Sequence, residues 1–318
     1  MKYKSILFLC TSLNLFLPLG LALESNLPSR RAFTEQILNV PATISIIPWC
    51  LISSPQAANA DSLAAKLSKR DASVLKNSVF NIPPSVQIYP PFMRGEWDVT
   101  LSFAGYLFPS TSIPKDKIVS NYNIPGFQKC SIATISDIGK DKATFHMSIS
   151  KDGVEDRKTT LQTSINSHLG YNAIEKVLYD PSSNPNRISI DFIPNRTRNA
   201  NRIELFCNAR ECELVTKDTI PTSATNATTS TGDSLSIFVN SEYIRQVTFG
   251  LSQEFGIARQ VVGNYAHFWT WREQLDRDTI KGNVLTAVYL DPQDPMFFDE
   301  PSKPVAVYSH QVTANKIL

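Results

Sequence analysis

The residues best suited to hold a ligand lie together in one stretch, residues 258–271. This stretch is predicted to be a β-strand, in which residues of odd number share one face. The large rings on that face belong to Tyr265, His267, Trp269 and Trp271. Four such rings form either a packed core, which is the commoner outcome, or the wall of a cavity. Because a buried histidine without a partner costs free energy, the pattern also indicates a site for a small apolar ligand. Its expected neighbours or rim are Phe103, Tyr106 and Arg272.

The sequence signatures of the common catalytic sites are missing. The stretch Gly250-Leu251-Ser252-Gln253-Glu254 begins like a nucleophile elbow but lacks its last glycine. Phosphate-binding loops, dinucleotide fingerprints and Cys-x-x-Cys pairs are also absent, and the four histidines form no His-x-x-x-His pair. An acid–base role for His267 with a nearby glutamate finds no support in the spacing. We therefore predict no catalytic residue, no metal and no cofactor.

Charge and cysteine content narrow the class of protein. The 318 residues include 31 basic and 29 acidic ones, a formal charge of +2, which argues against a nucleic-acid-binding protein. Five cysteines are too few for a disulfide-dense scaffold. Cys207 and Cys212 flank a short turn, residues 208–211, and on a hairpin they would face each other closely enough to form a disulfide. The alternative is two reduced thiols; Cys130 is left without a partner and is expected to be buried.

The elements that would position these residues are mostly strands. A short amphipathic helix is expected within residues 61–78, then a proline-rich extended lead-in to residue 92, then a β domain over residues 93–318. About ten strands with short turns predict an antiparallel β-barrel; a β-sandwich is the alternative. A helix is expected at 171–178 and a flexible loop at 219–233. The expected strands are 97–103, 130–138, 143–150, 158–165, 188–193, 203–207, 212–216, 235–249, 258–271, 282–289 and 305–312.

The first sixty residues have the pattern of targeting signals. Residues 1–22 combine a basic start with an apolar run, as in a secretory signal peptide. Residues 23–60 contain Arg30-Arg31, a second apolar stretch and Ala58-Asn59-Ala60, the pattern of a twin-arginine signal with its cleavage site. Two signals in tandem resemble the targeting of thylakoid-lumen proteins in algal plastids. The alternative is a secreted protein. No later stretch is apolar enough to span a bilayer, so the mature chain is not expected to be an integral membrane protein.

Two segments of the chain resemble known families. Residues 82–99, with Pro83-Pro84, Tyr89-Pro90 and Gly95-x-Trp97, and the run from Ala287 to Tyr308 resemble an uncharacterised plastid and cyanobacterial domain family. That resemblance implies a location in the thylakoid lumen. It implies no particular activity, because the family has no established one. Gly95-x-Trp97 is also similar to the opening of lipocalins and other calycin barrels, in which the tryptophan closes one barrel end under a basic side chain. Candidates for that cation are Lys316, Arg259 and Arg272.

Three functions are compatible with these observations. The first is a non-catalytic barrel in the thylakoid lumen that binds a small apolar ligand, a pigment or lipid, in an unfilled interior lined by Tyr265, His267 and Trp269. The second is an assembly or stability factor that contacts a subunit of a photosynthetic complex through an exposed apolar patch, such as residues 296–298. The third is an enzyme with an unrecognised site, which would need a cluster of polar groups with shifted pKa values in a pocket.

Overall fold

The computed structural model describes residues 62–77, 84–126, 132–135, 142–197, 200–216, 234–251 and 258–317. One compact unit spans Asn59–Leu318. The two predicted targeting signals, Cys130 and the predicted loop at 219–233 lie outside the described residues.

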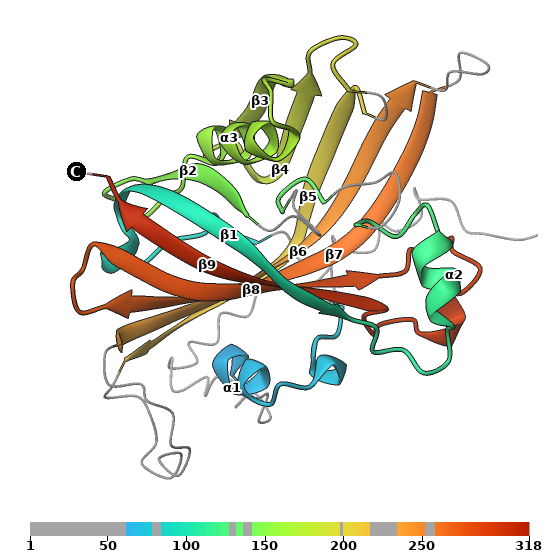
Figure 1. Cartoon of the computed structure of the whole chain (residues 1–318), viewed down its shortest axis with the longest axis horizontal. Coiled ribbons are helices and arrows are strands. Elements are labelled where there is room, and N and C mark those ends of the chain that lie inside the picture. The colour runs from blue at the N-terminus through green and yellow to red at the C-terminus, as the bar shows by residue number, and fades with distance from the viewer. Residues whose placement is uncertain are drawn as a thin grey trace, which may run out of the picture. The chain divides into compact units, whose positions relative to one another are not determined.

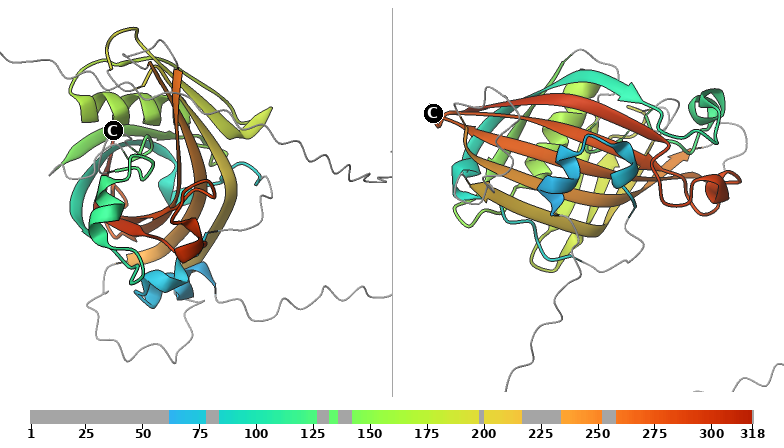
Figure 2. Two further views of the ribbon diagram at one scale, coloured as in Figure 1. Left: turned by 90° about the vertical axis from the view of Figure 1, so that its right-hand side faces the viewer. Right: turned by 90° about the horizontal axis from the view of Figure 1, so that it is seen from below.

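Nine antiparallel strands form one sheet in this part of the chain (Figure 1). Across the sheet their order is β2-β1-β9-β8-β7-β6-β5-β4-β3. The sheet curls strongly, so that it has a concave face, which holds the main core, and a convex face (Figure 2, left). In chain order the strands are β1 (Gly95–Leu107), β2 (Ala143–Ile149), β3 (Ile174–Asp180), β4 (Asn184–Phe192), β5 (Arg202–Thr216), β6 (Ser234–Leu251), β7 (Ala258–Gln274), β8 (Thr279–Tyr289) and β9 (Ala306–Lys316).

The gap between the two edge strands, β2 and β3, is covered by α3 (Arg157–Leu169), which packs against both (Figure 2, left). The helix also satisfies backbone groups at the free edge of β2. The hydroxyl of Thr163 accepts a hydrogen bond from the amide of His146 at 3.1 Å. A sheet edge without such cover would be open to pairing with another chain. The helix therefore takes the place that a further strand would have in a closed barrel.

The mainly antiparallel β class is confirmed, but the barrel does not close in the described structure, because β2 and β3 do not pair. The strand predicted at 158–165 and the helix predicted at 171–178 are both wrong. The first segment lies in the helix α3, and most of the second lies in the strand β3. Asp156 caps the helix by accepting from the amides of Lys158 and Thr159, and Gly170, at φ 77°, ends it. The threonines that suggested a strand instead use their hydroxyls on helix and edge-strand backbone.

Two further strand predictions change. The segments 203–207 and 212–216 are parts of one strand, β5, because residues 208–211 form no turn; a β-bulge lies between Cys207 and Ala209 instead. Within the predicted strand 130–138, the described residues 132–135 form turns.

The expected N-terminal helix is present as α1 (Leu63–Ser68), followed by the 3-10 turn η1 (Ala72–Val74). Both lie on the convex face of the sheet (Figure 2). The other short helices in the part of the chain that the structure describes are η2 (Pro91–Met93), α2 (Lys115–Ser120) and η5 (Phe297–Asp299). No helix among the described residues is long and apolar enough to cross a lipid bilayer.

Trp97 lies completely buried at the start of β1. Its indole nitrogen donates a hydrogen bond to the carbonyl of Met93 at 2.8 Å. Among the candidate cations, Lys316 lies above the ring: it faces Trp97 across β1 and β9, with Nζ 5.9 Å from a ring centroid. Gly95, at φ 117°, allows the backbone to enter the strand in a conformation that side chains disfavour.

Candidate functional site

The four rings on β7 all lie on its concave side. Tyr265 and Trp271 belong to the core there, and Trp269 packs half-buried against it. Trp269 and Trp271 stack with ring centroids 5.0 Å apart. The Tyr265 hydroxyl donates to Gln246 at 2.9 Å, and the Trp271 indole donates to Asn240 at 3.3 Å. Most of this face is therefore occupied by packed and hydrogen-bonded side chains.

His267 is completely buried, and both ring nitrogens have partners. Nδ1 lies 2.9 Å from the hydroxyl of Thr286 on β8, and Nε2 contacts the hydroxyl of Thr134. Burial lowers the pKa of His267 to about 3, because an apolar interior disfavours the charged ring. The ring is neutral at ordinary pH. It ties two hydroxyls together, an arrangement that suits positioning better than proton transfer.

A cluster of buried charges lies beside this histidine. Glu242 on β6 accepts hydrogen bonds from Arg210 on β5, at 2.8 Å, and from Arg157 at the start of α3. Glu155 accepts from the Tyr89 hydroxyl at 3.0 Å and lies 3.7 Å from the Arg157 guanidinium. Burial would raise the pKa of Glu242, but the two arginines lower it to about 2. Two cations and two anions thus balance one another inside the protein.

The spacing of residues did not reveal this cluster, although one signal was present. On β6 the residues of even number are largely polar. They face the concave side, and all are buried: Asn240, Glu242, Gln246 and Thr248. Buried polar residues on one face of a strand indicate partners on neighbouring elements. Those partners come from α3 and β5 and could not be identified by spacing.

The concave side of the described structure contains a small cavity of about 60 Å³. It is lined by Glu155, Arg157 and Glu242 of the charge cluster, by His267, Trp269 and Trp271, and by residues of α3. Pockets for small ligands typically measure about 300–1,000 Å³, whereas a few tens of Å³ hold one or two waters. The polar cluster with shifted pKa values that an enzyme would need is present, but its charges are engaged with one another.

The three expected rim residues do not gather at this cavity. Phe103 lies three strands from Trp269 in the same row of the sheet and packs against His310 at 5.3 Å. Tyr106 is 54% exposed at the end of β1, with its ring 6.4 Å from that of Phe103. Arg272 lines a pocket on the convex face. The sequence grouped Arg272 with residues on the opposite side of the sheet.

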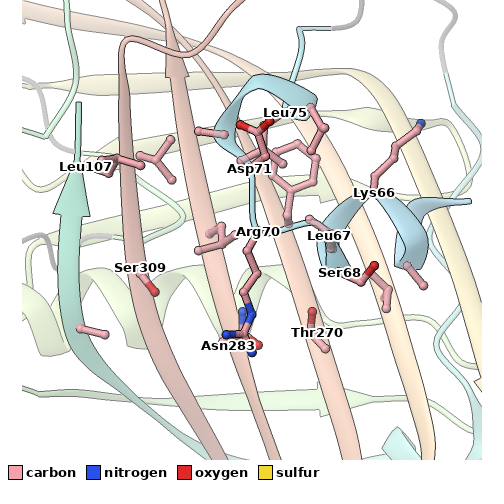
Figure 3. Close-up of a pocket in the computed structure, with 18 of the residues that line it drawn as sticks. Lys66, Leu67, Ser68, Arg70, Asp71, Leu75, Leu107, Thr270, Asn283 and Ser309 are labelled. Carbon is pink, nitrogen blue, oxygen red and sulfur yellow. The ribbon is translucent and has the colours of Figure 1, made fainter. Parts of the chain in front are cut away.

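The larger hollow is this convex groove, with a volume of about 1080 Å³. Outward side chains of β6 to β9 form its floor, and the segment that carries α1 and η1 lies over it (Figure 3). Its size reaches the upper end of the range for small-ligand pockets. The signal missed in the sequence is that β7 and β8 also carry apolar residues on their outer face, namely Ala266, Phe268, Leu285 and Ala287, which indicates that part of this face is covered too.

The side chains on the floor of the groove change from apolar to polar along the strands. The cross-strand rows on this face are Ala266–Ala287–Val307, then Phe268–Leu285–Ser309, then Thr270–Asn283–Gln311. Ala266 and Ala287 are fully buried, so the first row lines the groove through Val307. The first row packs around Leu75 in an apolar cluster, and beyond the last row lies Arg272. The groove is therefore apolar at one end and polar at the other. In Figure 3, Leu75 and Leu107 lie toward one end, while Thr270, Asn283 and Ser309 lie toward the other.

The covering segment is fastened at both ends. The buried hydroxyls of Tyr289 and Tyr243 donate to the carbonyls of Leu75, at 2.9 Å, and Lys76, at 3.0 Å. At the other end, a carboxylate oxygen of Glu213 on β5 accepts from the amide of Ala64 at 2.9 Å, in the first turn of α1. The groove between these anchors is thus bounded by a segment held in a defined place.

The charges along the groove do not balance. Lys66 lies 3.7 Å from Glu211, and Asp71 caps η1 through Ser73. Arg70 and Arg272 have no carboxylate partner among the described residues; Arg272 donates only a long hydrogen bond, 3.4 Å, to the side chain of Asn283. Burial lowers the pKa of Arg272 because its half-buried guanidinium is partly desolvated.

The predicted disulfide does not fit the structure. Cys207 and Cys212 lie five positions apart on one strand, β5, and both are free thiols, Cys207 buried and Cys212 exposed. Five residues of strand span about 16 Å, well beyond the Cα separation of about 7 Å that a disulfide tolerates. The prediction failed because residues 208–211 contain a bulge instead of a turn.

The C-terminal motif that resembles a known family has a structural role. Asp291 accepts hydrogen bonds from Arg245, at 3.1 Å, and Asn264, at 2.9 Å, and so ties the loop after β8 to β6 and β7. Asp294 accepts from the side chain of Asn121 at 2.6 Å, which connects the same loop to the end of α2.

Comparison with known proteins places the chain in a family. The chain matches no curated protein and no solved structure. A family model described as Domain of unknown function (DUF6816) matches residues 83–317, a range that contains all nine strands but neither α1 nor η1. The chain therefore belongs to the DUF6816 family.

Proposed function

We propose that this protein is a non-catalytic binding protein for a small apolar or amphiphilic ligand, such as a pigment or lipid, and that the ligand lies in the convex groove. The observation that carries the proposal is the groove itself, about 1080 Å³ in volume with an apolar end. The interior expected from the sequence is a weaker candidate because the cavity found there among the described residues measures about 60 Å³.

The test compares one substitution on each face of the sheet. Ser309→Trp places a large ring in the groove, whereas Trp269→Ala enlarges the interior cavity. Binding of a neutral fluorescent apolar probe is measured by titration, and each variant is first checked for a cooperative thermal transition. We expect Ser309→Trp to weaken binding at least about tenfold, as expected when a filled site loses apolar contacts, with Trp269→Ala near wild type. The reverse pattern would move the ligand to the interior.

The proposed location is the thylakoid lumen. Its support is the tandem pattern of residues 1–60 and the start of the compact unit at Asn59, next to the expected cleavage site after Ala60. The mass of the protein isolated from its source tests this. A chain that begins at Asp61 agrees with lumenal processing, while a chain that begins near Leu23 or bears glycan contradicts it. A calycin-like relationship is part of the same proposal, supported by Gly95-x-Trp97 under Lys316.

A second candidate function is an assembly or stability factor for a photosynthetic complex. It is favoured by Phe298, which is 85% exposed, although Met296 and Phe297 beside it pack partly against the core. The test is co-migration with a photosynthetic complex in native gels of thylakoid extract. We would expect Phe298→Asp to abolish co-migration and Ser309→Trp to preserve it.

A further inference from the structure

The polar end of the convex groove brings two arginines together from opposite walls. Arg272 rises from the floor on β7, and Arg70 comes from the connection between α1 and η1. Arg70 adopts φ 50°, an uncommon conformation outside glycine, and Figure 3 shows its side chain directed along the groove toward Asn283. Asn283 is also the residue that Arg272 contacts, at 3.4 Å. Both guanidinium groups therefore lie at the same end of the site.

These two cations are not neutralised by the described part of the chain. A guanidinium that is half removed from water usually has a carboxylate beside it, because burying an unpaired charge costs free energy. The interior of this protein follows that rule, since Arg157 and Arg210 share Glu242. Arg272 departs from it, having an amide oxygen as its neighbour. An unbalanced, partly desolvated arginine in a pocket is an arrangement suited to an anion from outside.

The net charge of the lining selects the kind of anion. Lys66 lies beside Glu211, so Arg70, Arg272 and Asp71 remain, which leaves one net positive charge. A carboxylate carries one negative charge, whereas a phosphate monoester carries about 1.5 to 2 near neutral pH and would be repelled by Asp71 as well. The apolar rows further along the groove suit a hydrocarbon chain attached to that head group.

We propose that the convex groove binds a long-chain carboxylate, with its head group held between Arg272 and Arg70 and its hydrocarbon chain along Phe268 and Leu285. This inference rests on the proposed function, since it names the class of ligand for the same site. Asn283 positions Arg272, and the hydroxyls of Thr270 and Ser309 border the head group. The segment of α1 and η1 supplies one of the two arginines, so this specificity depends on residues that precede the range matched by the family.

The experiment compares two probes of equal chain length, dodecanoate and dodecanol, by calorimetric titration of the full chain near neutral pH. Inorganic phosphate and acetate are the head-group controls. We expect dodecanoate to bind about ten- to a hundredfold more tightly than dodecanol, as hydrogen bonds to a charged partner predict. Acetate and phosphate alone should bind weakly or not at all. Equal binding of the two twelve-carbon probes, or binding of phosphate as tight as that of dodecanoate, would overturn the carboxylate assignment.

Variants assign the head group to the two arginines. Arg272→Gln and Arg70→Gln should each remove most of the preference for dodecanoate while dodecanol binding stays unchanged. Lys66→Gln is the matched control, because this lysine already lies beside Glu211, and it should keep the preference. Arg70 is exposed, so its variant should fold even if Arg272→Gln does not. If both arginine variants keep the preference, the assignment is wrong.

The outcomes also separate this inference from the proposed function. Dodecanol and dodecanoate could bind with equal affinity, and Ser309→Trp could abolish the binding of both. This result would support an apolar site in the groove and would overturn only the assignment of a carboxylate head group. Failure of both probes to bind would overturn the apolar site and, with it, this inference.

Discussion

Arg210 and Glu242 are direct cross-strand partners on β5 and β6 and form an ion pair of 2.8 Å, although each side chain is less than a tenth exposed. The bulge between Cys207 and Ala209 makes this pairing possible. Before it, residues of odd number on β5 face the concave side; after it, residues of even number do. One additional residue in the strand thus brings a cation into the core opposite an acid.

Removal of Glu242 should be strongly destabilising. In Glu242→Gln, Arg157 and Arg210 keep their positive charges in the interior without an anion between them. We expect the free energy of unfolding to fall by about 3–5 kcal/mol, measured by urea denaturation. Glu211→Gln is the control, since it removes an acid whose partner, Lys66, is 3.7 Å away near the surface; the loss there should be below about 1 kcal/mol. If both variants lost the same free energy of unfolding, the buried ion pairs would contribute no more to stability than the surface pair.

His267 should make stability depend on pH in a defined window. In the unfolded chain it binds a proton near pH 6.5, but in the folded protein only near pH 3. The unfolded state therefore gains protons first, so stability is full above pH 6.5 and falls as the pH drops toward 3. Glu242 adds its own loss below its ordinary pKa of 4.5, because its folded pKa is about 2. Denaturation at pH 6.5 and pH 5 isolates the histidine. His267→Gln should flatten this interval, and an unchanged slope would contradict the assignment.

The hydroxyl of Tyr289 should hold the groove's cover in place. Tyr289→Phe leaves the Leu75 carbonyl without its donor, and we expect a local loss of about 1–3 kcal/mol. Hydrogen exchange should therefore accelerate about tenfold or more in residues 63–75, with little change in β7 and β8. Tyr308→Phe removes a hydroxyl that donates to the Pro125 carbonyl instead, and should leave residues 63–75 unaffected. Equal exchange in both variants would mean that other contacts hold the segment.

The two cysteines of β5 should differ sharply in reactivity. Cys212 is exposed, whereas Cys207 is buried, and desolvation raises the pKa of its thiol to about 12. In the folded protein, an alkylating reagent should label Cys212 within minutes, and Cys207 should react only in denaturant. Mass spectrometry of peptides from non-reduced protein locates each label. Unlabelled cysteines joined in one peptide would instead support the disulfide that the sequence suggested.

The sequence was sufficient to predict which side chains share a face of β7 and that the fold is mainly β. The odd positions of Tyr265, His267, Trp269 and Trp271 placed them on one face of a strand, and this grouping depends only on the period of a strand. The mainly β class followed in the same way from the repeated alternation. The α3 segment was misassigned because its threonines favour strands, whereas the two caps that define it, Asp156 and Gly170, are weaker signals. Its role at the free edge of β2 depends on a neighbour that local propensity does not include.

The site itself was decided by tertiary structure. The sequence assigned Arg272 to the rim of an interior cavity, because the predicted strand ended at residue 271, whereas β7 continues and places residue 272 on the convex side; nor could the sequence tell that segment 62–77 would pack there. The pairing of Arg157 with Glu242 joins residues 85 apart, and the contact of Ala64 with Glu213 joins residues 149 apart. The sequence by itself thus determined which side chains share a face of each strand. Only the folded sheet determined which face has free space, because that depends on how the sheet curls and on what the rest of the chain packs against each side.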